Sequence, residues 1–184
     1  MLFIEGTDAD DNGDLKEGFR LLLEQNLRGN LPRIVMCNSK ESTIDTYINT
    51  QFPVKRGQSL KRFLLVDLDS KEENIESDLK KNKLSNYKQS SFYMIQEMEA
   101  WFLSQPDVLE MYFKQSIKEK LGAMQPTEIE NPSDKLRTWT KTNVRKDGYH
   151  KVKDGVELLK KLNLEKLMND FDDVKNLVTE LDKA

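Results

Sequence analysis

The sequence is poor in cysteine and histidine. Its 184 residues include one cysteine, Cys37, and one histidine, His150. A single cysteine excludes an internal disulfide, and these two side chains alone cannot supply the set of Cys and His ligands that closes a structural zinc site. Any metal that this chain binds is therefore expected to have oxygen ligands.

Long hydrophobic runs are also missing. No stretch approaches the ~20 apolar residues of a membrane-spanning helix, and Glu5 interrupts the first apolar stretch too early for a signal peptide. These absences predict a cytoplasmic protein that does not associate with membranes. The composition, 37% hydrophobic and 33% charged, predicts a modest core beneath a highly charged surface.

The chain has no glycine-rich phosphate-binding loop with Lys and Ser or Thr, so it cannot itself be a P-loop ATPase. Its net charge of -3 gives no overall attraction to nucleic acid, yet charge is unevenly distributed. Between Asp134 and Lys161 there are nine Lys and Arg residues against four acids, which predicts a local patch that attracts phosphate. The start of the chain is the opposite, with four acids close together: Asp8, Asp10, Asp11 and Asp14.

What the sequence does contain is an alternation of strand and helix patterns. Short apolar runs predict strands at residues 2–4, 34–37, 63–66 and 92–95. Between them, helical patterns are expected at residues 15–27, 42–49 and 72–83, the first capped by Asp14. Strands that alternate with helices predict an α/β fold, with a mostly parallel sheet covered on both faces.

The second half of the chain has a helical pattern. A helix is expected around residues 108–112, a loop at 122–133, and two helices between Val156 and Leu181, separated near Asn169. We therefore expect one domain over residues 1–184, with an α/β core at 1–105 and a helical flank at 106–184.

Acidic residues follow three of the four predicted strands: Glu5, Asp67, Asp69, Glu97 and Glu99. The carboxyl ends of parallel strands share one edge of a sheet, and ligands bind there in the crevice where the strand order reverses. Alternate strand residues point the same way, so Asp67 and Asp69 are expected to face this crevice, as are Glu97 and Glu99 if the strand continues that far.

Carboxylates packed together repel each other unless a cation compensates them, and oxygen ligands suit Mg²⁺ or Mn²⁺. Such a metal would activate a water molecule and stabilise charge on a phosphate. Lys151 is a further candidate, because a cation near the scissile phosphate stabilises developing charge. A lone surface histidine usually has no functional role, and this is the interpretation we favour for the neighbouring residue, His150.

Each acid also has a plainer explanation. Asp67 and Asp69 suit a polar turn, and Glu97 and Glu99 suit the positive end of a helix dipole. The acids between Asp8 and Asp14 fit a solvated loop better than a calcium loop, whose closing Glu is missing. Trp101, Phe102 and Cys37 are predicted core residues, and burial is also favoured for Trp139 over stacking on a base.

Two segments together resemble a known pattern. Ile4-Glu5-Gly6, followed by a hydrophobic strand that ends in Asp67-Leu68-Asp69, resembles the topoisomerase-primase (TOPRIM) pattern shared with OLD-type nucleases. The segment Gln96-Glu97-Met98-Glu99-Ala100-Trp101-Phe102-Leu103 is similar to a bacterial family of small TOPRIM-like proteins of unknown function, often encoded beside ATPases in defence loci. The likeness spans nearly the whole chain.

The resemblance implies a Rossmann-like TOPRIM fold and a Mg²⁺-dependent site that nicks or cleaves DNA or an RNA such as tRNA. In it, Glu5 acts in proton transfer or metal binding, Asp67 and Asp69 are ligands, and Glu97 or Glu99 supplies another. It also implies an ATPase partner in antiviral defence, and it is compatible with a homo-oligomer. Which of Asp8, Asp10 and Asp11 contributes stays open, because the family has an acidic pair where this chain has Thr7-Asp8-Ala9-Asp10-Asp11.

Two other functions remain open at this point. The same fold is compatible with a non-catalytic subunit that binds a partner ATPase or nucleic acid. The run Leu64-Leu65-Val66-Asp67-Leu68-Asp69 also fits the nucleophile strand of haloacid-dehalogenase-like phosphatases, in which the first Asp attacks phosphorus. The phosphatase ranks lower, because that strand usually comes early in the chain and little α/β sequence follows it here.

Overall fold

A computed structural model describes residues 1–6, 15–50 and 61–184. Within these ranges the chain forms a four-stranded parallel sheet in the order β2-β1-β3-β4. The strands are β1 (Leu2–Glu5), β2 (Ile34–Cys37), β3 (Phe63–Asp67) and β4 (Ser91–Met94). The α/β fold and the places of these strands, predicted from the apolar runs, are confirmed.

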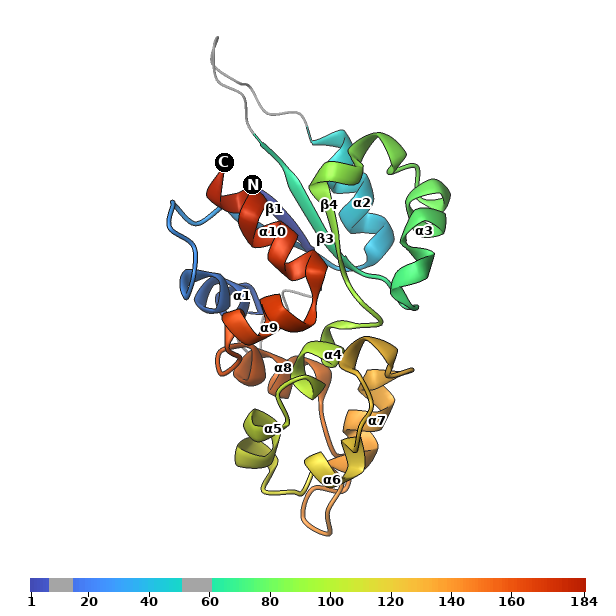
Figure 1. Ribbon diagram of the computed structural model, residues 1–184, viewed down its shortest axis with the longest axis vertical. Coiled ribbons are helices and arrows are strands. Elements are labelled where there is room, and N and C mark those ends of the chain that lie inside the picture. The colour runs from blue at the N-terminus through green and yellow to red at the C-terminus, as the bar shows by residue number, and fades with distance from the viewer. Residues whose placement is uncertain (7–14, 51–60) are drawn as a thin grey trace.

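Helices cover both faces of the sheet, as Figure 1 shows. On one face, α2 (Lys40–Asn49) packs on β1, β2 and β3, with α3 (Ile75–Lys81) on the same side. On the other face, α1 (Leu15–Glu24) contacts β2, and α10 (Asp172–Asp182) contacts β4. Two layers of helices around a parallel sheet explain why β3, the inner strand beside β4, is buried at every residue.

Local sequence accounts for where these elements begin and which face they bury. In α1, Leu15, Phe19, Leu22 and Leu23 recur at helical spacing and are all buried. Helix α2 begins with a capping box, in which Ser39 accepts a hydrogen bond from the Ser42 amide and the Ser42 hydroxyl accepts one from the Ser39 amide.

The other regular elements of the described chain are helices and 3-10 turns. Three 3-10 turns lie at Glu72–Asn74, Ser85–Ser90 and Pro126–Glu128. The remaining helices are α4 (Met98–Leu103), α5 (Pro106–Phe113), α6 (Lys118–Leu121), α7 (Pro132–Trp139), α8 (Lys151–Leu159) and α9 (Leu164–Asp170). In Figure 1, α5, α6 and α7 extend away from the sheet, and α4 connects them to it. Trp101 and Phe102 of α4 are buried, as predicted.

The expectation of two helices between Val156 and Leu181, separated near Asn169, is wrong. Three helices occupy this region, because α9 begins where the side chain of Asn163 accepts a hydrogen bond from the Lys166 amide. The next break is at Phe171, which adopts an extended conformation and turns its ring into the core.

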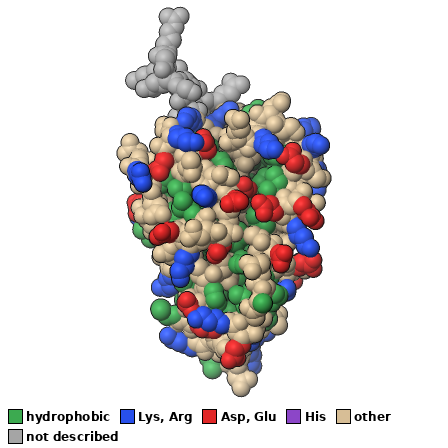
Figure 2. Space-filling model, viewed as in Figure 1, with side chains coloured by type: hydrophobic (Ala, Val, Ile, Leu, Met, Phe, Trp, Pro, Cys, Tyr) green, Lys and Arg blue, Asp and Glu red, His purple; other side chains and the backbone are tan. Residues whose placement is uncertain are grey.

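Charge is mixed over the surface. On the face that Figure 2 shows, Lys and Arg side chains alternate with Asp and Glu side chains, with hydrophobic atoms between them. This agrees with the charged composition of the sequence. Across the described residues, no helix has the length and apolar character that crossing a membrane requires.

Candidate functional site at the carboxyl ends of β1 and β3

The strand order reverses between β1 and β3. The chain passes from β1 to β2 on one side, and then returns to place β3 on the other side of β1. In open α/β sheets, ligands bind outside the carboxyl ends of the strands at such a reversal. Glu5 is the last residue of β1 and Asp67 the last of β3, so the topology places both acids at this point.

Hydrogen bonds to the backbone hold these two carboxylates in place. Glu5 Oε2 accepts from the Asp67 amide at 3.0 Å, and Asp67 Oδ1 accepts from the Met98 amide at 2.9 Å. Asp67 is only 6% exposed, while Glu5 is half-buried. Each carboxylate therefore has a fixed orientation and a second oxygen that these bonds do not use.

Glu99 is the third acid of the cluster, and it is 0% exposed. Its Oε1 accepts a hydrogen bond of 2.9 Å from the hydroxyl of Tyr149, which is also buried. Its Oε2 has no hydrogen-bond partner among the described residues. A fully buried carboxylate oxygen without a donor is uncommon and calls for an explanation.

The ammonium group of Lys151 lies between Asp67 and Glu99. Its Nζ is 3.6 Å from Asp67 Oδ2 and 3.7 Å from Glu99 Oε2. Both distances fit an ion pair, but they exceed those of hydrogen bonds. Since 55% of the Lys151 side chain is exposed, it approaches the buried acids from the solvent side.

Another buried acid, Asp154, fixes the start of α8 and so the position of Lys151. Its Oδ2 accepts from the His150 amide at 2.7 Å and from the Arg145 guanidinium, and its Oδ1 accepts from the Tyr112 hydroxyl at 3.0 Å. Meanwhile, the His150 ring accepts from the Lys153 amide as the cap of α8. This agrees with a structural role for the histidine.

Asp69 and Glu97 lie at the margin of the cluster. Asp69 has a left-handed backbone with φ of 59°, so it does not continue β3, and its side chain is 64% exposed, with Oδ2 3.9 Å from Lys40 Nζ. Glu97 Oε2 accepts from the Ser133 amide at 3.0 Å. The condition that the strand continues through Glu97 and Glu99 is not met, because β4 ends at Met94 and the chain enters α4 at Met98.

The electrostatics of the cluster follow from burial and from an excess of acids. Burial, together with Glu5 and Glu99, raises the pKa of Asp67 well above its ordinary value, against the opposing effect of Lys151. Burial also raises the pKa of Glu5 and that of Glu97. For Lys151, burial acts to lower the pKa, but the acids led by Glu99 and Asp67 outweigh it and raise the pKa. The site therefore favours binding of positive charge.

A pocket of about 170 Å³ opens beside the cluster. Polar groups on its wall come from Glu5, Asn38, Asp67 and Lys151, and the rest of the wall is formed by Gly6, Leu15, Met94, Met98 and Val152. A substrate group in this pocket would therefore contact both acids and the lysine while apolar side chains limit access of water.

The donor chemistry fits a hard divalent cation, although the acids do not converge as they stand. In the described part of the chain, no three His, Cys, Asp or Glu side chains are grouped closely enough to hold a metal ion. Asp67 and Glu99 nevertheless each direct an oxygen toward Lys151 that accepts no hydrogen bond, and Glu5 lies beside them. Asp8, Asp10, Asp11 and Asp14 lie outside the described residues.

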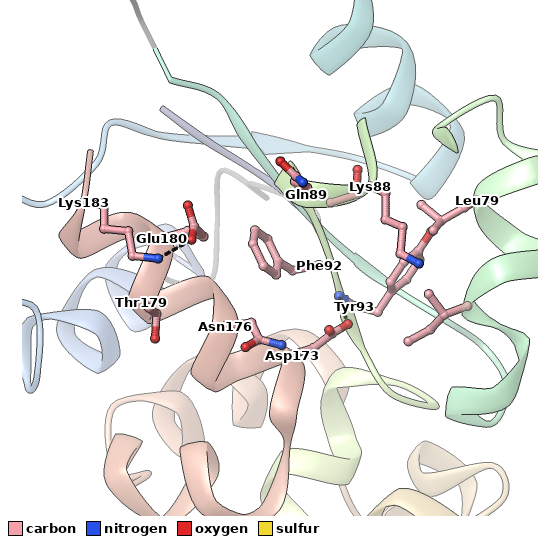
Figure 3. Close-up of a pocket in the computed structure, with 12 residues that line it drawn as sticks. Leu79, Lys88, Gln89, Phe92, Tyr93, Asp173, Asn176, Thr179, Glu180 and Lys183 are labelled. Carbon is pink, nitrogen blue, oxygen red and sulfur yellow. Dashed lines mark hydrogen bonds and ion pairs between the residues drawn. The ribbon is translucent and has the colours of Figure 1, made fainter. Parts of the chain in front are cut away.

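A larger pocket, of about 640 Å³, lies along the edge strand β4, between α3 and α10 (Figure 3). There Asp173 Oδ2 accepts a hydrogen bond of 2.9 Å from the Tyr93 amide, which points out from the sheet edge. Burial raises the pKa of Asp173 to about 6. The other acid of this pocket, Glu180, is paired with Lys183 and is not grouped with Asp173 around one lysine, so the size of the pocket alone does not make it the candidate site.

Sequence reasoning identified Glu5, Asp67, Glu99 and Lys151, and the structure brings these four residues together. It missed Tyr149, Asp154 and Asn38 as parts of the site. The only signal for Tyr149 and Asp154 was their closeness in sequence to Lys151, and nothing local indicates that a tyrosine binds an acid 50 residues away.

The fold and this cluster define a doubly wound α/β protein with an acidic site at the reversal of strand order. More specifically, the chain belongs to the family described as a domain of unknown function (DUF4276), whose model matches residues 22–182. The match includes Asp67, Glu99, Tyr149 and Lys151, and Glu5 lies before it. No curated protein and no solved structure matches the chain.

Proposed function

We propose that this protein is a nuclease that cleaves phosphodiester bonds of DNA, or of an RNA such as tRNA, with Mg²⁺ or Mn²⁺. The observation that carries the proposal is the meeting of Glu5, Asp67, Glu99 and Lys151 beside one pocket, where the strand order reverses. The TOPRIM resemblance supports the same chemistry, since it assigns Glu5 and Asp67 to a magnesium site.

In this proposal, Asp67 and Glu99 hold the divalent ion. Three further acids contact the ion directly or through water: Glu5, Asp69 and Glu97. A bound metal would supply an activated water molecule and positive charge against the phosphate. Glu5 is suited to take a proton from the attacking water, because burial raises its pKa and a backbone hydrogen bond orients it. Lys151 reaches the pocket from solvent and would pair with a phosphate oxygen.

We further propose that the protein is the effector subunit of a cytoplasmic antiviral complex that contains an ATPase. The support is the resemblance to proteins encoded beside ATPases in defence loci. Because the sequence has no P-loop, any dependence on ATP would come from the partner subunit.

One observation favours a second candidate, a non-catalytic subunit that binds a partner ATPase or nucleic acid. The Lys151 ammonium already compensates Asp67 and Glu99 in part, so the cluster has a structural use without metal. The phosphatase alternative has less support, since its nucleophile strand usually comes early in the chain, whereas Asp67 ends β3, the third strand.

The test is cleavage of plasmid DNA and of a tRNA pool in Mg²⁺, Mn²⁺ or EDTA. Wild type is compared with Asp67→Asn, and with Asp134→Asn as a matched control at an exposed acid of α7. We expect metal-dependent cleavage that Asp67→Asn lowers at least ~100-fold and that the control retains. Cleavage unaffected by Asp67→Asn, or no cleavage even when an ATPase encoded beside the gene is added, would contradict the proposal.

A further inference from the structure

The acids on either side of Lys151 are held rigidly, whereas its ammonium is held loosely. Glu99 is fixed by the Tyr149 hydroxyl and Asp67 by the Met98 amide, and both acids are buried. The Lys151 Nζ makes no hydrogen bond to either of them, at 3.6 and 3.7 Å, and over half of its side chain is exposed. The structure thus combines a fixed pair of anions with a movable cation.

This arrangement leaves Glu99 Oε2 poorly satisfied. The atom is fully buried and accepts no hydrogen bond among the described residues. A buried carboxylate oxygen without a donor costs free energy unless a cation lies close to it. The only cation within ion-pair distance, in the part of the chain that the structure describes, is that of Lys151.

We propose that Lys151 is a built-in substitute for the divalent ion, and that its ammonium and the ion compete for Asp67 and Glu99. When the ion binds, it displaces Lys151 toward the pocket that this side chain lines, where the ammonium meets the substrate phosphate. This inference rests on the proposed function, because it requires a divalent ion at this cluster.

Electrostatics and geometry both require the displacement. Mg²⁺ takes oxygen ligands at about 2.1 Å, so it would occupy the space between the two acids that the ammonium now faces. A second cation within about 4 Å would repel it strongly at this buried position. The lysine has a route outward, since Asp154 anchors the amide of the preceding residue, His150, while over half of the Lys151 side chain is exposed.

The test is direct Mn²⁺ binding, measured by electron paramagnetic resonance of free Mn²⁺, to wild type and Lys151→Met. Lys153→Met is the matched control, because Lys153 is an exposed lysine on the same helix. Removing the competing charge is expected to tighten Mn²⁺ binding roughly tenfold in Lys151→Met and to leave the control unchanged. Cleavage by Lys151→Met is expected to fall despite the tighter binding.

The outcomes separate this inference from the proposed function. If wild type binds Mn²⁺ and Lys151→Met binds it equally or more weakly, the competition is wrong while the metal site stands. If neither protein binds Mn²⁺, the metal-dependent function itself is contradicted, and the inference falls with it.

Two further conservative variants keep the test informative even if Lys151→Met does not fold. Lys151→Arg keeps the positive charge, so it is expected to bind Mn²⁺ no more tightly than wild type; tighter binding would contradict competition by charge. Glu99→Gln keeps an oxygen for the Tyr149 hydroxyl, so it should fold without metal but bind Mn²⁺ at least ~10-fold more weakly. Unchanged Mn²⁺ binding by Glu99→Gln would overturn the placement of the ion.

Discussion

Two fully buried acids, Asp154 and Glu99, differ in how many hydrogen bonds their carboxylate oxygens accept from the protein. Asp154 accepts from the His150 amide, the Arg145 guanidinium and the Tyr112 hydroxyl, so both of its oxygens are satisfied. Glu99 accepts only from Tyr149, and its second oxygen has an exposed lysine at 3.7 Å in place of a hydrogen bond.

This difference indicates which of the two acids has a functional role and which has a structural role. The Asp154 site shows that this chain can fully satisfy a buried carboxylate with its own donors. Sites where a protein departs from such satisfaction are commonly functional, because the missing interaction is supplied by a ligand. The contrast therefore supports ion binding at Glu99 and Asp67, and a structural role for Asp154.

The largest expected effect comes from removing the satisfied acid. Asp154→Ala leaves the Arg145 guanidinium and the His150 amide without their acceptor, so it should lower the free energy of unfolding by about 4 kcal/mol in urea titrations. Asp134→Ala, at an exposed ion pair with Arg137, is the control and should change it by under ~0.5 kcal/mol. If Asp154→Ala lowers the free energy of unfolding by less than ~1 kcal/mol, the structural role given to Asp154 is contradicted.

A smaller effect is expected at the partner of Glu99. Tyr149→Phe removes the single donor to Glu99 and keeps the ring that packs on Phe102. The free energy of unfolding without metal should fall by about 2 kcal/mol, because a hydrogen bond to a charged group is lost. Added Mn²⁺ should raise the melting temperature of Tyr149→Phe and so restore part of the lost stability. Identical melting curves of this variant with and without Mn²⁺ would contradict ion binding at Glu99.

The smallest effect concerns Asp173, a partly buried acid that accepts one hydrogen bond, from the Tyr93 amide. Its pKa of about 6 lies above the ordinary value of 3.8, so the folded protein holds a proton there that the unfolded chain has released. As the pH rises from about 4 to 6, the contribution of Asp173 to stability falls.

Asp173→Asn removes this titration while keeping an oxygen for the Tyr93 amide. Relative to wild type, its free energy of unfolding should therefore rise by about 1–2 kcal/mol between pH 4 and pH 7, measured by urea titration at each pH. A difference between the two proteins that does not change with pH would show that Asp173 has no raised pKa.

The sequence predicts the sheet well because its signals are local. The apolar runs at residues 2–4 and 63–66 form buried strands that end at Glu5 and Asp67. These two acids lie at one edge because the carboxyl ends of parallel strands share an edge of the sheet. By the same logic the location of the candidate site follows from strand order, before any side chain is placed.

What could not be predicted depends on contacts between distant parts of the chain. The Tyr149 hydroxyl meets Glu99 because α4 and the start of α8 pack together, and no sequence period encodes that approach. Asp69 has a left-handed backbone that alternation along a strand does not anticipate. The extra helix boundary lies at Asn163, whose backbone exchanges two hydrogen bonds with the side chain of Gln105, 58 residues away.

The most direct test of the central claim is a crystal structure of the protein with Mn²⁺, with the ion located by anomalous diffraction. We predict an anomalous peak between Asp67 and Glu99, with the Lys151 ammonium moved away from both acids into the neighbouring pocket. A site free of Mn²⁺, with Lys151 still between Asp67 and Glu99, would contradict the account.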